Sequence, residues 1–327
     1  MPSNLLPPAS RDELEEPLGQ ITKARSFSLS IIIPTKNRVR PLGELLESLR
    51  GVADIGAVRP EVVVADNDSS DGTYDVAVAT AKDFPTTIRV LKVVRAGKSA
   101  AINAAVKSAS GEVLAFLDDD VVVDKTWLTA VEHFFRGGEY QAGQGLIRLQ
   151  APARDDPEII KLIQRYRTIP SLEHDPEGKP LHSLNGANFF VSRNAFDRVG
   201  GFDERLGPGA SGTSEDVDFA RRLTRARIAI GYAPRAIVYH RVDRQRLTEA
   251  YFKQIHWRQG ASRLLMQRRS TAAILFNLTR VAAQYVFYTL IGKERNRYRS
   301  KGRIYHYLGM IAAKRNGSAG LKSSELP

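Results

Sequence analysis

The sequence contains no cysteine among its 327 residues. This absence excludes a disulfide framework, a thiolate metal site and a cysteine nucleophile. The first twenty residues also lack the positive segment and the apolar run of a secretory signal, so we expect the protein to work in the cytoplasm. Residues 1–26 show no apolar periodicity, and we expect them to form a mobile leader.

Acidic residues are scarce in the C-terminal part of the chain. Residues 241–315 hold 17 Lys or Arg against three acids, a local charge of +14, whereas the whole chain carries +12. The remainder is therefore close to neutral. Such a basic tail fits an anionic partner, which could be lipid headgroups, a pyrophosphate-bearing acceptor or nucleic acid.

Long apolar runs are also few, and the longest lies in this tail. Residues 271–291 have nearly the length of a membrane-spanning helix, but Asn277, Arg280 and Gln284 interrupt them. The spacing of three and four residues puts these polar side chains on one helical face. We therefore expect an amphipathic helix on the inner face of the cytoplasmic membrane, and the alternative is a helix packed against the rest of the protein.

The first 120 residues alternate between apolar runs and amphipathic segments, with polar loops between them. This rhythm is typical of βαβ units in a parallel sheet. The expected strands are residues 28–33 (closed by Pro34), 61–65, 87–94 and 113–117. The expected helices are residues 39–49, 74–82, 100–109 and 127–135.

Three acids follow the fourth strand at once, at Asp118, Asp119 and Asp120. The carboxyl ends of parallel strands meet at one sheet edge, which is where open α/β sheets bind ligands. Neighbouring carboxylates repel one another, so a fold that gathers them there usually adds a cation. The alternative is a solvated acidic turn. A phosphate-binding P-loop at 97–99 is excluded, because position 92, where its first glycine belongs, is Lys.

The alternation of expected strands and helices ends after residue 143. Residues 150–183 read as a variable insert with one helix, and the glycine-rich loop 207–212 as a lid beside a site. Ser214 is the expected N-cap of a helix that begins with Glu215 and Asp216. These two acids could equally serve only the helix dipole. The other expected elements are a helix at 159–166, a strand at 184–192, a helix at 193–199, and short strands at 228–233 and 236–239.

Five segments in order resemble those of family 2 glycosyltransferases with the GT-A fold. They are IIIPTKNR (31–38), VVVADNDSSDGT (62–73), GKSAAINAAVKSASGEVLAFLDDD (97–120), GANFFVSRNAFDRVGGFDE (186–204) and EDVDFARRL (215–223). The resemblance implies a Rossmann-like, mostly parallel sheet flanked by helices. It divides the chain into a catalytic domain at 27–245, with a nucleotide-sugar half at 27–125 and an acceptor half at 126–245, and a helical extension at 246–327.

The resemblance also implies roles for particular residues. Asp216, with Glu215 beside it, would be the general base of an inverting sugar transfer from a nucleotide-diphosphate sugar to a hydroxyl acceptor. Asp120 and His240 would ligate manganese or magnesium. Residues implied in nucleotide-sugar binding are Pro34, Thr35, Asn37, Arg38, Asp66, Asp68, Lys98, Asp118 and Asp119. Lys98 could instead be a solvated lysine, and His240 a structural histidine.

Processive family members carry a Q-x-x-R-W signature, which Gln254-Ile255-His256-Trp257-Arg258 does not meet. The expected enzyme therefore adds a single sugar, to a glycan or lipid-linked acceptor in cell-envelope or exopolysaccharide assembly, and no nucleic acid is expected as partner. Two alternatives stay open at this point. One is a nucleotidyltransferase of similar topology, and the other is a non-catalytic protein that binds anionic surfaces through its tail.

Overall fold

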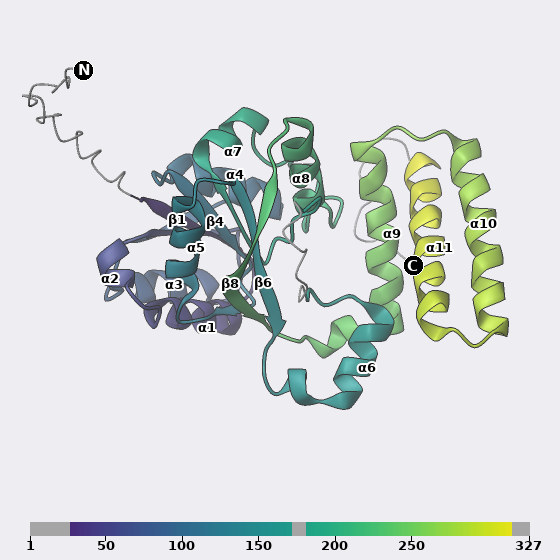
Figure 1. Ribbon diagram of the computed structural model, residues 1–327, viewed down its shortest axis with the longest axis horizontal. Helices are drawn as coiled ribbons and strands as arrows, with labels where there is room; N and C mark the ends of the chain where they lie inside the picture. Colours follow the sequence, from purple (N-terminus) through teal and green to yellow (C-terminus); the bar gives the residue numbers. More distant parts are fainter. Residues whose placement is uncertain (1–26, 172–180, 316–327) are drawn as a thin grey trace, which may run out of the picture.

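The computed structural model describes residues 27–171 and 181–315, so the expected leader at 1–26 lies outside the described part. One eight-stranded sheet in the order β3-β2-β1-β4-β7-β6-β8-β5 forms the centre of the molecule, with helices on both faces (Figure 1). Its strands are β1 (Leu29–Thr35), β2 (Glu61–Asp66), β3 (Ile88–Lys92), β4 (Val113–Leu117), β5 (Val121–Val123), β6 (Ala142–Leu149), β7 (Asn188–Ser192) and β8 (Ile230–His240).

The first half of the sheet is parallel, as the βαβ rhythm predicts. β1 lies between β2 and β4, and Thr35 is opposite Asp66 at the ends of their strands. The loops after β1, β2 and β4 therefore reach the same edge. The predicted end of β1 is wrong, because the strand continues through Pro34 to Thr35. Its pairing with β4 stops at Ile32, so a proline without an N–H is tolerated beside β2 alone.

The second half of the sheet is mixed, and here the sequence predictions were less complete. β7 is antiparallel to both β4 and β6, and neither β5 nor β6 was predicted. The two short strands expected at 228–233 and 236–239 are one strand, β8, which pairs with β6 across a register shift after Gly145. The residues expected to separate two strands form a bulge within β8 at this register shift. The strand expected at 184–192 is shorter and starts at Asn188.

The helices before residue 226 cover the two faces of the sheet, and two separate apolar cores lie between them and the sheet. One core joins α1, α3 and α5 to the sheet, and the predicted stripe of α1 is buried there. The other core joins α4, α7 and α8. The bounds of these helices are α1 (Val39–Arg50), α2 (Ile55–Val58), α3 (Thr73–Ala81), α4 (Lys98–Ser108), α5 (Trp127–Arg136), α6 (Pro157–Tyr166), α7 (Arg193–Val199) and α8 (Glu215–Arg225).

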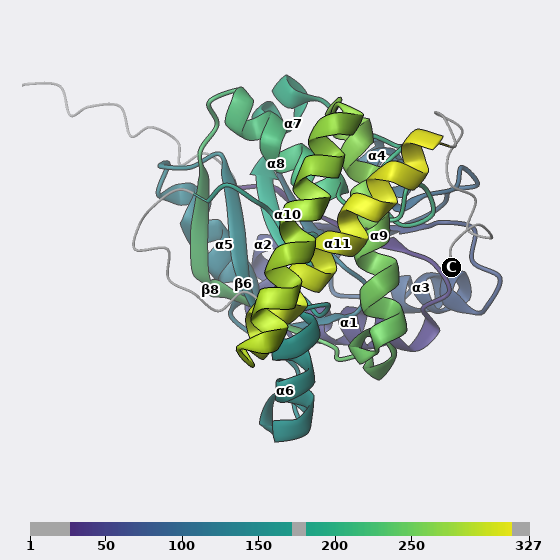
Figure 2. The ribbon, with the colours of Figure 1, turned by 90° about the vertical axis from the view of Figure 1, so that its right-hand side faces the viewer.

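Residues 244–315 form the 3-10 turn η2 (Arg244–Leu247) and three long helices, α9 (Glu249–Met266), α10 (Thr271–Leu290) and α11 (Glu294–Arg315). α11 lies between the other two, and α10 is outermost (Figures 1 and 2). Glycines make this packing close: a Cβ on Gly260 would lie 1.9 Å from the His306 carbonyl oxygen. In the part of the chain that the structure describes, no helix is both long and apolar enough to cross a bilayer.

The insert connects this helical extension to the sheet. α6 begins after a second 3-10 turn, η1 (Ala153–Asp155), and is capped by Asp156, whose carboxylate accepts the N–H of Glu158. The Tyr166 ring packs against Phe252 of α9 at 5.7 Å between centroids. α6 therefore packs against the helical extension.

Candidate active site

The acids after β4 meet the loop after β1 at the sheet edge. The Thr35 hydroxyl donates to the Asp119 carboxylate at 2.7 Å. Burial and the neighbouring Asp120 raise the pKa of Asp119 to about 7, although Thr35 and Arg38 oppose the shift. The three acids are thus held in a partly buried cluster, which argues against the alternative of a solvated acidic turn.

Asp66 sits at the end of β2 and is completely buried. One carboxylate oxygen accepts the Ser69 N–H at 3.1 Å, whereas the other has no hydrogen-bond partner among the described residues. Asn37 fastens the β1 loop to the β2 loop, because its side-chain oxygen accepts the Ser70 N–H at 2.9 Å. Asp68, in contrast, is exposed, and we find no described partner for its side chain.

Lys98, the first residue of α4, lies at the centre of the site. Its ammonium is 2.5 Å from the Asp118 carboxylate and 3.3 Å from that of Glu215. Burial alone would lower the pKa of Lys98, but Asp118 and Glu215 outweigh it and raise that pKa above its ordinary value. In turn, Lys98 holds the pKa of Asp118 below its usual value against the effect of burial. A solvated lysine is therefore the wrong description.

Asp120 faces the end of β8. Its carboxylate lies 3.3 Å from His240 Nε2 and 3.3 Å from the guanidinium of Arg246. His240 Nδ1 is 2.7 Å from the Arg241 carbonyl oxygen, so it must carry the hydrogen. In the neutral ring, Nε2 then turns a free lone pair toward a carboxylate oxygen. Two acceptors that converge in this way, in a buried place, fit a shared divalent cation.

The protein supplies only part of a metal shell here. Within residues 27–171 and 181–315, no group of three or more His, Asp or Glu side chains could hold a metal ion by itself. Magnesium-type sites commonly complete their shell with water and substrate phosphates. The pair of Asp120 and His240 fits a site of that kind, with Arg246 as a protein cation on the same carboxylate.

Asp216 lies in the first turn of α8, whose position is set by aromatic packing: Phe219 of this helix stacks on Phe202 at 4.7 Å. The Asp216 carboxylate accepts the N–H groups of Gly186 at 3.0 Å and Val217 at 2.7 Å. Burial and the Glu215 charge raise the pKa of Asp216 to about 7, with Lys98 and the two hydrogen bonds opposing. Such a group can accept a proton near neutral pH.

The start of α8 differs from the prediction in one respect. Ser214 precedes the helix in the left-handed region, with φ of 77°, and its side chain makes no capping hydrogen bond. The expected N-cap role is therefore wrong. The loop before Ser214 is held against α4 by a backbone hydrogen bond, in which the Pro208 carbonyl accepts the Lys98 N–H at 2.9 Å.

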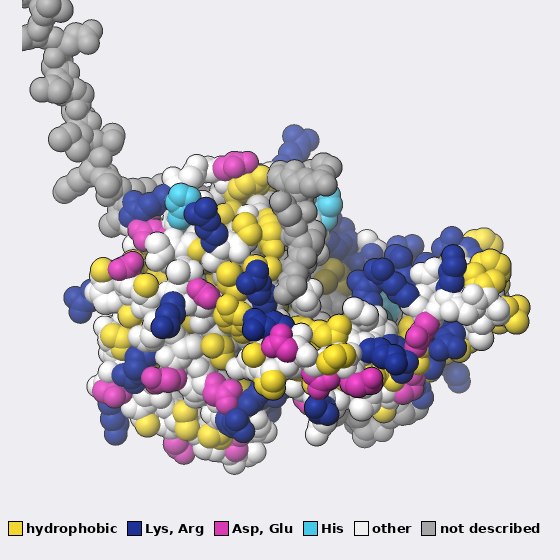
Figure 3. Space-filling view, turned by 60° about the horizontal axis from the view of Figure 1, so that its bottom comes forward, with side chains coloured by type: hydrophobic (Ala, Val, Ile, Leu, Met, Phe, Trp, Pro, Cys, Tyr) yellow, Lys and Arg dark blue, Asp and Glu magenta, His cyan; other side chains and the backbone are white. Residues whose placement is uncertain are grey.

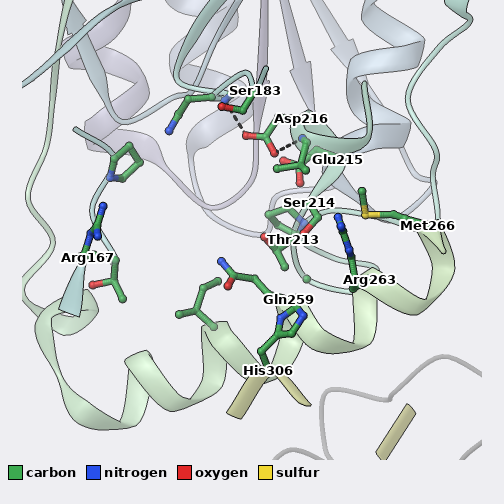
Figure 4. A pocket seen from close by; sticks show the side chains of 18 of the residues that line it. Arg167, Ser183, Thr213, Ser214, Glu215, Asp216, Gln259, Arg263, Met266 and His306 are labelled. Atoms are coloured by element: carbon green, nitrogen blue, oxygen red, sulfur yellow. Dashed lines mark hydrogen bonds between the residues drawn. The ribbon is translucent and has the colours of Figure 1, made fainter. Parts of the chain in front are cut away.

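A cavity of about 850 Å³ connects these groups to the helical extension. Lys98, Asp118, Glu215 and Asp216 line its inner side. Figure 4 shows Asp216 pointing toward the cavity, with Gln259 and Arg263 of α9 and His306 of α11 on the opposite side. The loop 207–212 borders the cavity through Pro208 and Gly212, where the sequence predicts a lid.

Three contributors to the site escaped the sequence analysis. Arg246 is one of 17 cations in the tail, and nothing local distinguishes it. Gly186 supplies the N–H for Asp216, and a Cβ there would come within 3.0 Å of Lys98 Nζ. Asn67 accepts the Gly97 N–H at 2.8 Å and so holds the loop before Lys98. Only Asn67 had a usable signal, as a polar residue directly after a buried strand.

Comparison with known protein families identifies the family to which the chain belongs. The family model described as glycosyl transferase family 2 matches residues 30–200, which is more than half of the chain. The chain belongs to this family. The match confirms the predicted family and enzyme class, a glycosyltransferase, and sets aside the nucleotidyltransferase and the non-catalytic binding protein.

Curated relatives include the succinoglycan biosynthesis protein ExoM of Rhizobium meliloti, which is 27% identical over 75% of this chain and 78% of its own length. Glycosyltransferase AglE of Haloferax volcanii is 26% identical over 65% of this chain, and the aligned region spans 66% of AglE. The structure resembles that of a mannosyltransferase from Pyrobaculum calidifontis, solved with GDP-Man and Mn²⁺. That match has a TM-score of 0.52 and 16% identity over 91% of this chain and 76% of the other, which supports the GT-A fold.

Proposed function

We propose that this glycosyltransferase moves a sugar from a nucleotide-diphosphate sugar to a hydroxyl acceptor in one inverting displacement. The observation that carries this proposal is Asp216, a half-buried carboxylate with a pKa of about 7 on the wall of a cavity that Lys98 and Asp118 also line.

The donor nucleotide would lie along the loops after β1 and β2. The unpartnered oxygen of Asp66 is a buried acceptor suited to an N–H of the base. Asn37 and Thr35 hold this edge together through Ser70 and Asp119. The family resemblance assigns Pro34, Arg38 and Asp68 to the same edge, and of these Asp68 has the least structural support, because it is exposed.

The diphosphate would lie near Lys98 and Arg246, two cations that now face Asp118 and Asp120. Asp120 and His240 would hold a manganese or magnesium ion, which when bound neutralises charge on the departing diphosphate. The likeness to a structure solved with Mn²⁺ supports a divalent cation without identifying it. Lys98 and Arg246 offer fixed positive charge to the same group.

Asp216 would act on the acceptor. As the acceptor oxygen bonds to the anomeric carbon, the bond from that carbon to the diphosphate breaks, and the hydroxyl proton passes to Asp216. Attack opposite the leaving group inverts the anomeric configuration, in contrast to the covalent two-step route of retaining enzymes. Glu215 has a different part, because its carboxylate is turned toward Lys98 and holds that ammonium in position.

The acceptor is proposed to be a glycan or a lipid-linked glycan of the cell envelope. ExoM is named for succinoglycan biosynthesis, which is consistent with such an acceptor. The absence of the processive signature supports single addition.

We also propose that α10 rests on an anionic membrane surface. Its outward face exposes Phe276 (69% exposed), Phe287 and Leu290 (80% exposed). Arg268 before the helix and Lys293 after it are exposed cations. Figure 3 shows apolar side chains at the far end of the extension, with Lys and Arg beside them. This combination of apolar face and flanking cations suits a helix lying in the interface.

The transfer step can be tested without knowing the acceptor, since water can replace it slowly. UDP-glucose and GDP-mannose would be incubated with manganese, and the anomer first released would be read by proton NMR. We expect the wild type to release sugar with inverted configuration. Asp216→Asn should lose this release, whereas Asp197→Asn, which changes an exposed acid on α7, should keep it. Release with retained configuration would overturn the mechanism.

A further inference from the structure

The outer end of the active-site cavity carries a cluster of guanidinium groups that the transfer step does not use. Arg263 near the end of α9 and Arg269 just after it line the cavity. Arg221 of α8 lies near enough to influence Arg263 electrostatically. Figure 4 shows Arg263 across the cavity from Asp216, on the side of the helical extension.

Among the residues that the structure describes, we find no Asp or Glu in an ion pair with Arg221, Arg263 or Arg269. Other arginines of the same region are paired, such as Arg246 with Asp120 and Arg222 with Asp218. The acids of the described residues that line the cavity are Asp118, Glu215 and Asp216, and all three lie close to Lys98.

The electrostatic consequence is visible at two groups. Burial lowers the pKa of Arg263, and the charges of Arg221 and Arg269 lower it further. Burial, His256, Arg263 and Arg303 together lower the pKa of His306 to about 4. His306 is therefore neutral at pH 7 and adds no charge; burial is the largest cause of its lowered pKa, and the nearby cations Arg263 and Arg303 add to it.

Like charges held together are unfavourable unless an anion joins them. Guanidinium groups match phosphate oxygens in geometry as well as charge, through paired N–H donors. We propose that the acceptor carries a phosphate or diphosphate group, and that Arg263 and Arg269, with Arg221 adding positive charge nearby, bind it while the acceptor sugar reaches Asp216. This inference rests on the proposed function, because it names the acceptor of that same site.

The surroundings indicate what the phosphate is attached to. Ala273, Ile274 and Asn277 of α10 line the same end of the cavity, and the other face of α10 exposes Phe276 and Phe287. An apolar chain attached to the phosphate could thus leave the cavity beside the helix that we assign to the membrane. We therefore expect a phosphate ester of an apolar chain to bind better than the inorganic ion.

Binding of geranyl diphosphate can be measured by calorimetry, with UDP and GDP in excess with manganese to fill the donor site. Inorganic pyrophosphate and geraniol serve as probes of the phosphate and the chain alone. We expect geranyl diphosphate to bind more tightly than either. Arg263→Ala should weaken its binding roughly 10-fold or more, since a hydrogen bond to a charged group is lost. Arg225→Ala, which removes an exposed arginine of α8 that does not line the cavity, should leave it unchanged.

Nucleotide binding separates this inference from the proposed function. If UDP or GDP binds equally to wild type and Arg263→Ala while geranyl diphosphate affinity does not differ between them, the acceptor subsite is refuted and the donor site stands. If Arg263→Ala loses nucleotide binding while keeping its fold by circular dichroism, the cluster belongs to the donor and the inference is again refuted. Arg269→Gln, at an exposed position, provides a second variant should Arg263→Ala fail to fold.

Discussion

Replacement of Asp216 by Asn tests the assignment of the general base, because it should change activity and stability in opposite directions. Asn has nearly the same shape but cannot take the acceptor proton. General-base catalysis contributes roughly 10²- to 10⁴-fold, so kcat should fall by about that factor, which is about 3 to 5 kcal/mol of the barrier. The donor KM should change little, because Lys98 and Asp118 remain paired.

The effect on stability follows from the raised pKa. Burial moves the pKa of Asp216 from 3.8 to about 7, so the folded state binds this proton more tightly than the unfolded state does. Ionisation therefore costs stability as pH rises from about 4 to 7, and a shift of about 3 units corresponds to about 4 kcal/mol above pH 7. Asn does not titrate and avoids this cost. It also loses one hydrogen bond, from Gly186 or Val217, worth about 1 kcal/mol.

The net expectation is a variant that is roughly 2 to 3 kcal/mol more stable than wild type at pH 8 and slightly less stable near pH 4. Urea unfolding at the two pH values measures the free energies, and release of nucleoside diphosphate measures the activity. Asp197→Asn, at an exposed position on α7, should change neither. A variant at Asp216 that loses stability at pH 8 as well as activity, or keeps its activity, would refute the reasoning.

Three further outcomes are expected. Wild-type kcat/KM should fall about tenfold per pH unit below pH 7 as Asp216 is protonated; a flat profile down to pH 5 would rule out this base. Lys98→Met should cost roughly 3 to 5 kcal/mol of stability by leaving the buried Glu215 and the half-buried Asp118 unpaired, whereas Lys107→Met at an exposed position of the same helix should be neutral in urea unfolding. Replacing Phe276 and Phe287 by Ser should abolish cosedimentation with vesicles containing anionic lipid; unchanged binding would remove α10 from the membrane.

The sequence was most informative where the elements are local and buried. The apolar spacing of α1 and the continuous apolar runs of β1, β2 and β4 require no tertiary knowledge, and the loops that follow these strands do meet at one edge. β6 was missed because two glycines, Gly143 and Gly145, weaken its strand signal. Their reason is tertiary: a Cβ at Gly143 would lie 2.3 Å from the Phe190 ring.

The sequence motifs identify the residues of the candidate site, but they do not predict which of these residues form ion pairs with one another. No local pattern indicates that Lys98 bridges Asp118 and Glu215, which are separated from it by 20 and 117 positions. The partner of Asp120 is likewise set by how η2 turns back toward β4, which brings Arg246 across 126 positions. The unpaired arginines of the helical extension became meaningful only when the fold put Arg263 on the same cavity as Asp216.

The most direct test of the account is a thermal-shift screen with UDP, GDP, dTDP and CMP and their sugars, with and without manganese, on wild type and Asp120→Ala. A ligand that binds only the folded state raises the melting temperature, by an amount set by its concentration and affinity. The account predicts that one nucleotide stabilises the wild type in the presence of manganese and does not stabilise Asp120→Ala. Failure of every nucleotide to stabilise the wild type would contradict a nucleotide-sugar site at this sheet edge.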